Sequence, residues 1–135
     1  MLNDFIHIAN IRSSVILTGS YVAATVVGPT ATGVFNVECS AYNQLKVVAN
    51  FTIGSLTDAD IKIEFSHDGT TYSQETFSSI ATTQDTMSLG HHTMAATGVY
   101  EINAPITGRF IRVSAVGNGT ATSSLLALDV ILSTK

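Results

Sequence analysis

Apolar and polar residues alternate with a period of two through most of the chain, and no long stretch repeats at helical spacing. The segment "DIKIEFS" shows the pattern best, because Ile61, Ile63 and Phe65 fall on one face of an extended chain. Lys62 and Glu64 fall on the other face, which we expect to meet water. The pattern predicts an all-β protein.

The last expected strand, "SLLALDVILS", is apolar on both faces. One face carries leucines and a valine, and the other carries Leu125, Ala127 and Ile131 around Asp129. We therefore expect the second face to be covered as well, by another sheet edge or by a neighbouring subunit. Further strands are expected at residues 13–18, 21–27, 34–39, 44–53, 72–79, 99–104 and 109–116.

Turn residues separate these segments at short intervals. They are Gly19, Gly28-Pro29, Gly33, Asn43, Gly54, Asp68-Gly69, Gly98, Gly108 and Gly117-Asn118-Gly119. Short strands with this punctuation are typical of an antiparallel β-sandwich or jelly roll of about eight or nine strands. At 135 residues the chain is expected to form one domain, with residues 1–12 as an N-terminal arm and residues 13–135 as the sandwich. The first ten residues could instead form a short helix. The segment 53–62 is expected to be a loop with Asp58 and Asp60 as solvated turn residues.

Charged residues make up only 12% of the chain, against 45% hydrophobic residues. A surface with so few charges suits a protein that lives in contact with other chains, although an uncharged secreted domain shares this composition. The net charge is −4 and the six basic residues are scattered, which argues against direct binding of nucleic acid. The charged residues in the first 17 positions interrupt both a signal peptide and a membrane span, so we expect synthesis in the cytoplasm and no membrane partner.

Two histidine-containing segments are candidates for chemistry. His67-Asp68 precedes Gly69 between two expected strands, and a turn explains these residues without catalysis. His91 and His92 would point to opposite faces of a strand, so they favour a solvated or interface loop over a metal site. In a symmetric oligomer they could instead form a histidine ring at the axis, with pH-sensitive association.

The remaining motifs predict neither an enzyme nor a cofactor. No G-x-S-x-G elbow is present, and the lone Cys39 excludes both an intrachain disulfide and a thiolate metal site. Asp58 and Asp60 alternate as calcium ligands can, but the glycine and glutamate of an EF-hand loop are missing. The absence of tryptophan counts against a lectin, although Tyr72 or Tyr42 could stack on a sugar.

Two segments carry a resemblance to known families. In "FSHDGTTYSQ" a strand ends in S-x-D-G-T-x-aromatic, and in "RFIRVSAV" a later strand begins with an aromatic residue, isoleucine and arginine. Across residues 44–132 the chain resembles discoidin-type carbohydrate-binding sandwiches and small β-sandwich virion proteins of tailed bacteriophages. Discoidin modules are usually secreted and closed by a disulfide, which a single cysteine does not allow. The phage proteins share the charge-poor composition and the hydrophobic last strand.

The resemblance implies a virion structural protein, most specifically a capsid decoration or cement protein on the outer capsid surface. Such a protein would be made in the host cytoplasm, form a homotrimer and bind the major capsid protein, with contacts expected at residues 1–12, Gly28-Pro29 and His91-His92. A tail or neck component is the near alternative. The competing class is a carbohydrate-binding module for surface adhesion, in which His67, Asp68, Tyr72 and Arg109 would line a site for a surface glycan.

Overall fold

The computed structural model describes residues 5–15, 22–23, 37–39, 41–74, 76–80, 85–120 and 123–134. These ranges contain strands and no helix, so the prediction of an all-β chain is confirmed. The strands are β1 (Phe5–Val15), β2 (Val22–Ala23), β3 (Val37–Glu38), β4 (Gln44–Thr52), β5 (Leu56–Ser66), β6 (Ser73–Gln74), β7 (Thr76–Ile80), β8 (Asp85–Leu89), β9 (His92–Met94), β10 (Gly98–Pro105), β11 (Phe110–Gly119) and β12 (Leu125–Ser133).

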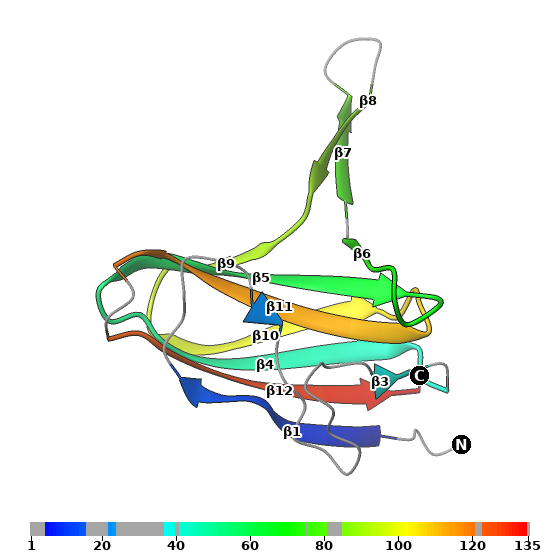
Figure 1. The fold of residues 1–135 in the computed structure, drawn as a ribbon, viewed down its shortest axis with the longest axis horizontal. Helices are drawn as coiled ribbons and strands as arrows, with labels where there is room; N and C mark the ends of the chain where they lie inside the picture. Colours follow the sequence, from blue (N-terminus) through cyan, green and yellow to red (C-terminus); the bar gives the residue numbers. More distant parts are fainter. Residues whose placement is uncertain are drawn as a thin grey trace.

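Two antiparallel sheets face each other, which confirms the β-sandwich (Figure 1). The four-stranded sheet has the order β1-β12-β4-β10. The six-stranded sheet has the order β2-β11-β5-β6, with β3 also pairing with β11 and β9 also pairing with β5. The order shows that neighbours within the four-stranded sheet come from distant parts of the sequence.

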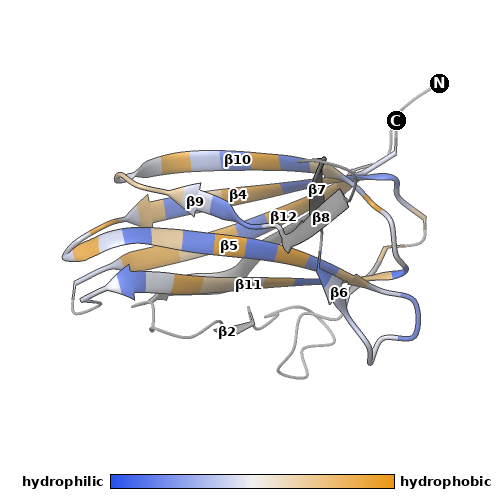
Figure 2. Ribbon diagram, turned by 90° about the horizontal axis from the view of Figure 1, so that it is seen from above, coloured by the Kyte–Doolittle hydropathy of each residue, from blue (hydrophilic) through white to orange (hydrophobic). Residues whose placement is uncertain are grey.

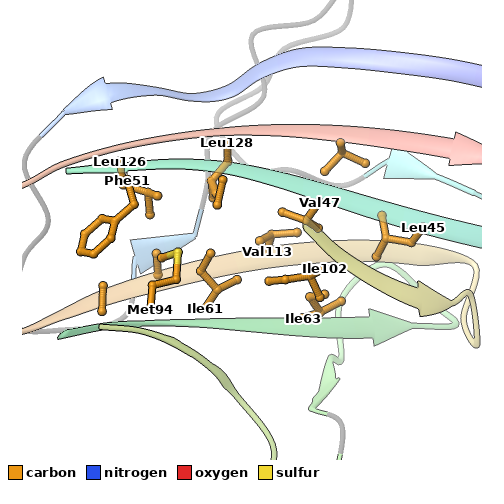
Figure 3. Packing of buried hydrophobic residues seen from close by; sticks show 14 of the residues in the cluster. Leu45, Val47, Phe51, Ile61, Ile63, Met94, Ile102, Val113, Leu126 and Leu128 are labelled. Atoms are coloured by element: carbon orange, nitrogen blue, oxygen red, sulfur yellow. The ribbon is translucent and has the colours of Figure 1, made fainter. Parts of the chain in front are cut away.

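The core fills the space between the two sheets, and its residues are those that the two-residue alternation selects. Figure 2 shows the alternation of polar and apolar residues along β4, β5 and β10. Among the residues whose burial the structure describes, Phe51 is the largest fully buried side chain, and Met94 of β9 is also buried (Figure 3). Both sheets contribute, with Leu45, Val47, Ala49, Ile102, Leu126, Leu128, Val130 and Leu132 from one, and Ala59, Ile61, Ile63, Ile111, Val113 and Ala115 from the other.

The expected strands at 44–53, 99–104, 109–116 and 124–133 correspond to β4, β10, β11 and β12. The expected segment 72–79 is divided between β6 and β7. Of the earlier segments, the structure describes residues 13–15, 22–23 and 37–39, which contain the end of β1, β2 and β3. The turn signals at Gly19, Gly28-Pro29 and Gly33 lie outside the described residues.

The predicted loop at 53–62 is wrong, because β5 begins at Leu56 and includes both aspartates. Asp58 and Asp60 lie on the same face of this strand, where Asn118 Nδ2 on β11 donates to both carboxylates at 2.6 and 2.9 Å. These hydrogen bonds offset the low strand propensity of aspartate. The predicted turn at residues 117–119 is also wrong. Strand β11 continues to Gly119 and pairs there with the start of β5.

The alternation did not predict β8 or β9. Strand β9 is short and polar except for Met94, whose burial against the core explains why this segment is extended. Strands β7 and β8 pair only with each other in the described part of the chain, and this ribbon stands away from the sandwich (Figure 1).

The first described residues belong to the four-stranded sheet. Strand β1 pairs with β12 and runs past residue 12, with irregular register between Ile8 and Val15. The short-helix alternative is therefore wrong for the described residues 5–10, which are extended. The division into an arm of residues 1–12 and a sandwich of residues 13–135 stays a prediction.

The outer faces of the two sheets differ in burial. On the six-stranded sheet Glu64 is only 5% exposed, so the expectation that it meets water is wrong. On the four-stranded sheet Leu125 is 38% exposed, and Ala127, Asp129 and Ile131 are half-buried. Cover of that second face by a neighbouring subunit stays a prediction.

Candidate functional site

Asp68 organises the loop that connects β5 to β6. Its Oδ1 accepts hydrogen bonds from the backbone N–H groups of Thr71 at 2.7 Å and Thr70 at 2.8 Å, and from Ser66 Oγ at 2.8 Å. Gly69, at φ 77°, donates its N–H to Ser66 Oγ at 2.9 Å. The bonds from Thr71, Thr70 and Ser66, in that order, hold the pKa of the Asp68 carboxyl far below its usual range. The carboxylate therefore shapes the turn, as expected of Asp-Gly between strands.

A charged pair lies beside this loop on the outer face of the six-stranded sheet. Arg112 Nη2 is 2.7 Å from Glu64 Oε2, and Arg112 Nε is 3.3 Å from Glu64 Oε1. Lys62 Nζ lies 3.6 Å from the same Oε1. The Arg112 guanidinium is 4.1 Å from the centre of the Tyr72 ring, and burial raises the pKa of Tyr72 against the opposing effect of Arg112. Tyr72 thus packs over the charged pair.

The two adjacent histidines lie at another place on the same sheet. His92 is the first residue of β9 and pairs with Ile61, whereas His91 precedes the strand with its Nε2 3.8 Å from Asp60 Oδ1. Asp60 also accepts a hydrogen bond from Thr93 Oγ1 at 2.7 Å. Within the described ranges no group of three His, Cys, Asp or Glu side chains is placed to hold a metal ion.

Two adjoining hollows lie at the end of the sandwich where β5 and β10 finish. The first, of about 210 Å³, is lined among others by Ile63, Phe65, Ser73, Gln74, Ala104 and Pro105. The second, of about 300 Å³, is more open and is lined by Tyr42, Ile106, Gly108 and Arg109. His67 and Thr107 line both, so the two hollows are neighbours on the surface.

Backbone and thiol contacts fix the segments around these hollows. The Cys39 N–H donates to the Arg109 carbonyl at 2.7 Å, and Cys39 Sγ lies 3.2 Å from the Gly108 and Arg109 carbonyl oxygens. The Ile106 N–H donates to the Asn43 carbonyl at 3.0 Å. Cys39 and Asn43 are therefore held against residues 106–109, and Tyr42 and Arg109 lie at the second hollow.

Gly108 allows the second of these segments to pack closely on the end of β5. A Cβ at this position would lie 2.8 Å from Phe65 Cβ and 3.1 Å from Ser66 N. Any larger residue would push the segment away from β5 and from His67. Gly108 is thus needed for close packing against β5 as well as for a turn, and the alternation of apolar and polar residues does not predict this packing.

The structure brings together two of the six candidate residues, His67 and Arg109, beside Tyr42, which the sequence suggested as an alternative to Tyr72 for stacking on a sugar. Asp68 follows His67 but is bonded within its own loop, and Tyr72 covers Arg112. Sequence reasoning missed the roles of Cys39, Gly108 and Glu64. For Glu64 a signal existed, because an arginine at the corresponding place on a neighbouring strand can pair with it.

The described part of the chain contains no helix long and apolar enough to cross a membrane. All buried side-chain nitrogen and oxygen atoms in the same part have a hydrogen-bond partner.

Comparisons with known proteins identify a likeness in fold. No protein-family model matches the chain, and no curated protein matches it. A protein of the Bacillus endospore appendages, described as a novel family of disulfide-linked pili, is 12% identical with a TM-score of 0.49, over 98% of this chain and 87% of that chain. The PRD1 vertex protein P5 is 5% identical with a TM-score of 0.50, over 98% of this chain and 96% of that chain. At this identity the PRD1 protein and this chain share a fold.

Proposed function

We propose that this protein is a virion structural component without enzymatic activity, and specifically a capsid decoration or cement protein that binds the outer surface of a phage head. The observation that carries the proposal is the fold shared with PRD1 vertex protein P5 across nearly the whole of both chains. The charge-poor composition and the resemblance to small virion sandwiches support it. The partners would be the major capsid protein and two further copies of this chain.

The outer face of the four-stranded sheet offers a surface for such contacts. Val48 and Ile131 are half-buried on this face, and Leu125 is partly exposed. Val99 on the edge strand β10 is 68% exposed. A protein that bridges capsid subunits adds contact area that must be lost before the subunits separate, and binding to the assembled lattice stabilises it by linkage.

Co-sedimentation with empty capsids from the same source tests the proposal, together with the native mass of the purified protein. We expect a trimer that sediments with capsids, and stripped capsids that melt at a lower temperature than decorated ones. A monomer that stays in the supernatant, with no change in capsid melting, would refute the decoration role. Binding to isolated tails or necks instead would assign the protein to those structures.

Substitution of Val99 tests the contact surface. Val99→Glu adds a carboxylate to the exposed face of β10 and should abolish trimer formation or capsid binding. Ala95→Glu is the matched control, because Ala95 is also exposed but lies in the loop between β9 and β10. Equal binding by both variants would exclude this face as the contact.

A second candidate function is carbohydrate binding for surface adhesion, and the depression lined by Tyr42, His67 and Arg109 favours it. An aromatic ring beside polar side chains in a hollow is a common arrangement for sugar binding. A glycan array tests this function independently of the capsid experiments. An array without hits would remove it and leave the structural proposal standing.

A further inference from the structure

We infer that the β7–β8 ribbon contacts a second copy of this chain through the face that carries Ile80, Met87 and Leu89. This contact rests on the self-association in the proposed function and identifies the segment that makes it. The ribbon stands away from the sandwich (Figure 1), and the strands before and after it, β6 and β9, belong to the six-stranded sheet.

The ribbon is an insertion in a strand that pairs with β5. Strand β11 occupies one side of β5, so β6 and β9 both pair with its other side. Gln74 of β6 lies opposite Glu64, and His92 of β9 lies opposite Ile61. Two residues of β5 lie between these positions, so two residues would join β6 to β9 as one continuous strand. The chain has residues 75–91 at this place instead.

Hydrogen bonding and charge hold both ends of the insertion against the sandwich. Gln74 Nε2 donates to the carbonyl of the buried Gly90 at 2.7 Å, which ties the start of the insertion to its end. His91 Nε2 lies 3.8 Å from Asp60 Oδ1 on β5. The ribbon therefore leaves the sheet from a fixed base. Because β6 and β9 already pair with β5, the sheet does not depend on the residues between them.

Residues 76–89 give the ribbon one charge and one largely apolar face. Residues that lie opposite each other, and residues two apart on one strand, share a face. The register therefore places Ile80 of β7 on the same face as Met87 and Leu89 of β8. Asp85, the one charged residue of this segment, shares this face at the end farthest from the sandwich. The opposite face carries one apolar residue and three residues with hydroxyl groups.

A ribbon of this composition needs a partner. Two strands alone are marginally stable in water, and packing of an apolar face against other elements supplies the missing stability. The partner has to be present wherever the chain folds, and a further copy of the same chain meets this condition. Met87 and Leu89 lie in uncharged pairs near the base, so identical faces can pack around a symmetry axis there without bringing like charges together.

Self-association through the ribbon leaves another surface for the capsid. A trimer bound to a capsid needs one surface for its copies and a different one for the capsid subunits. The outer face of the four-stranded sheet, with Val48 and Ile131, belongs to the other sheet of the sandwich. The ribbon and this face can therefore be occupied at the same time.

Analytical ultracentrifugation of the unmodified protein and two full-length variants tests the contact. Met87→Glu should raise the dissociation constant of the oligomer by about 100-fold or more, because it brings carboxylates of different copies together. Thr86→Glu is the matched control, since it adds the same charge at the neighbouring position on the opposite face. This variant should keep the mass of the unmodified protein.

A third variant removes the ribbon and keeps the sandwich. It replaces residues 75–91 by two threonines, which suit a strand and complete the register between Gln74 and His92. Far-UV circular dichroism should show the β fold. The variant should sediment as a monomer at concentrations where the unmodified protein is oligomeric.

The outcomes distinguish the ribbon contact from self-association by another surface. A Met87→Glu variant with the mass of the unmodified protein would overturn the ribbon contact and leave self-association standing, whether or not the shortened variant folds. A folded, oligomeric shortened variant would do the same. Equal loss of association in Met87→Glu and Thr86→Glu would also overturn the contact through this face. An unmodified protein that is monomeric at every concentration would overturn both the ribbon contact and the homotrimer.

Discussion

Replacing Arg112 by methionine should lower the free energy of unfolding by about 2–3 kcal/mol, because it leaves Glu64 buried without its main partner. The Glu64 side chain is 6% exposed and the Arg112 side chain 31%. Removing one partner of a buried pair typically costs about 3–5 kcal/mol. We expect less here, since Arg112 is partly solvated and Lys62 remains 3.6 Å from Glu64 Oε1. Methionine is unbranched and of similar length, so it fills much of the space of the arginine stem without the charge.

Urea unfolding followed by circular dichroism measures this cost, at one protein concentration for all variants because self-association adds to stability. In thermal unfolding, the Arg112→Met variant should lose roughly 6–15 °C in Tm, at about 3–5 °C per kcal/mol for a domain of this size. The double variant Arg112→Met/Glu64→Leu should be more stable than Arg112→Met alone, because no unpaired charge stays buried.

Two results would refute this reasoning. One is an Arg112→Met variant within about 0.5 kcal/mol of the unmodified protein, the range of ordinary surface substitutions. The other is a double variant whose loss equals the sum of the two single losses, since additivity means that the side chains do not interact.

Two further substitutions test the loop and its neighbour. Asp68→Ala should lower the free energy of unfolding at neutral pH. Folding lowers the pKa of Asp68, so the stability difference between the unmodified protein and the variant should be fully present above about pH 4. The difference should become smaller as the pH falls further. Denaturant midpoints measured across pH check this, and a difference that does not change with pH would contradict it. Gly108→Ala should cost about 1–3 kcal/mol, because its Cβ would approach Phe65 Cβ at 2.8 Å. Gly98→Ala is its control, with the nearest atom at an ordinary 3.5 Å, and equal midpoints for both variants would contradict the close packing.

The alternation predicted the central strands because their burial follows a period of two. Ile61 and Ile63 are buried as expected, and the same holds for alternate residues of β12. It failed at Asp58 and Asn118, where side-chain hydrogen bonds between two strands stabilise residues that usually mark turns. Strand β9 was not predicted, because its three residues contain a single apolar side chain, Met94, and one position cannot show an alternation of apolar and polar residues.

The candidate site was only partly predictable, for a different reason. The Asp68-Gly69 turn is local, so its residue types reveal it. The meeting of Tyr42, His67 and Arg109 depends on three segments that are far apart in the sequence. The spacing and composition of a sequence do not show which loops lie at the same end of a sandwich. The sequence therefore grouped His67 and Arg109 with Tyr72, but in the structure Tyr72 packs against Arg112.

The pairing of β1 with β12 has a consequence for synthesis. The first and last strands are hydrogen-bonded neighbours, and β12 also separates β1 from β4 in the four-stranded sheet. While the chain is being made, β1 and β4 have no partner between them until residues 125–133 have left the ribosome. This sheet must therefore close after translation of its last strand, in a slow step that depends on long loop closures. Loss of β12 by truncation would remove the strand that joins β1 to β4, so the four-stranded sheet could not form.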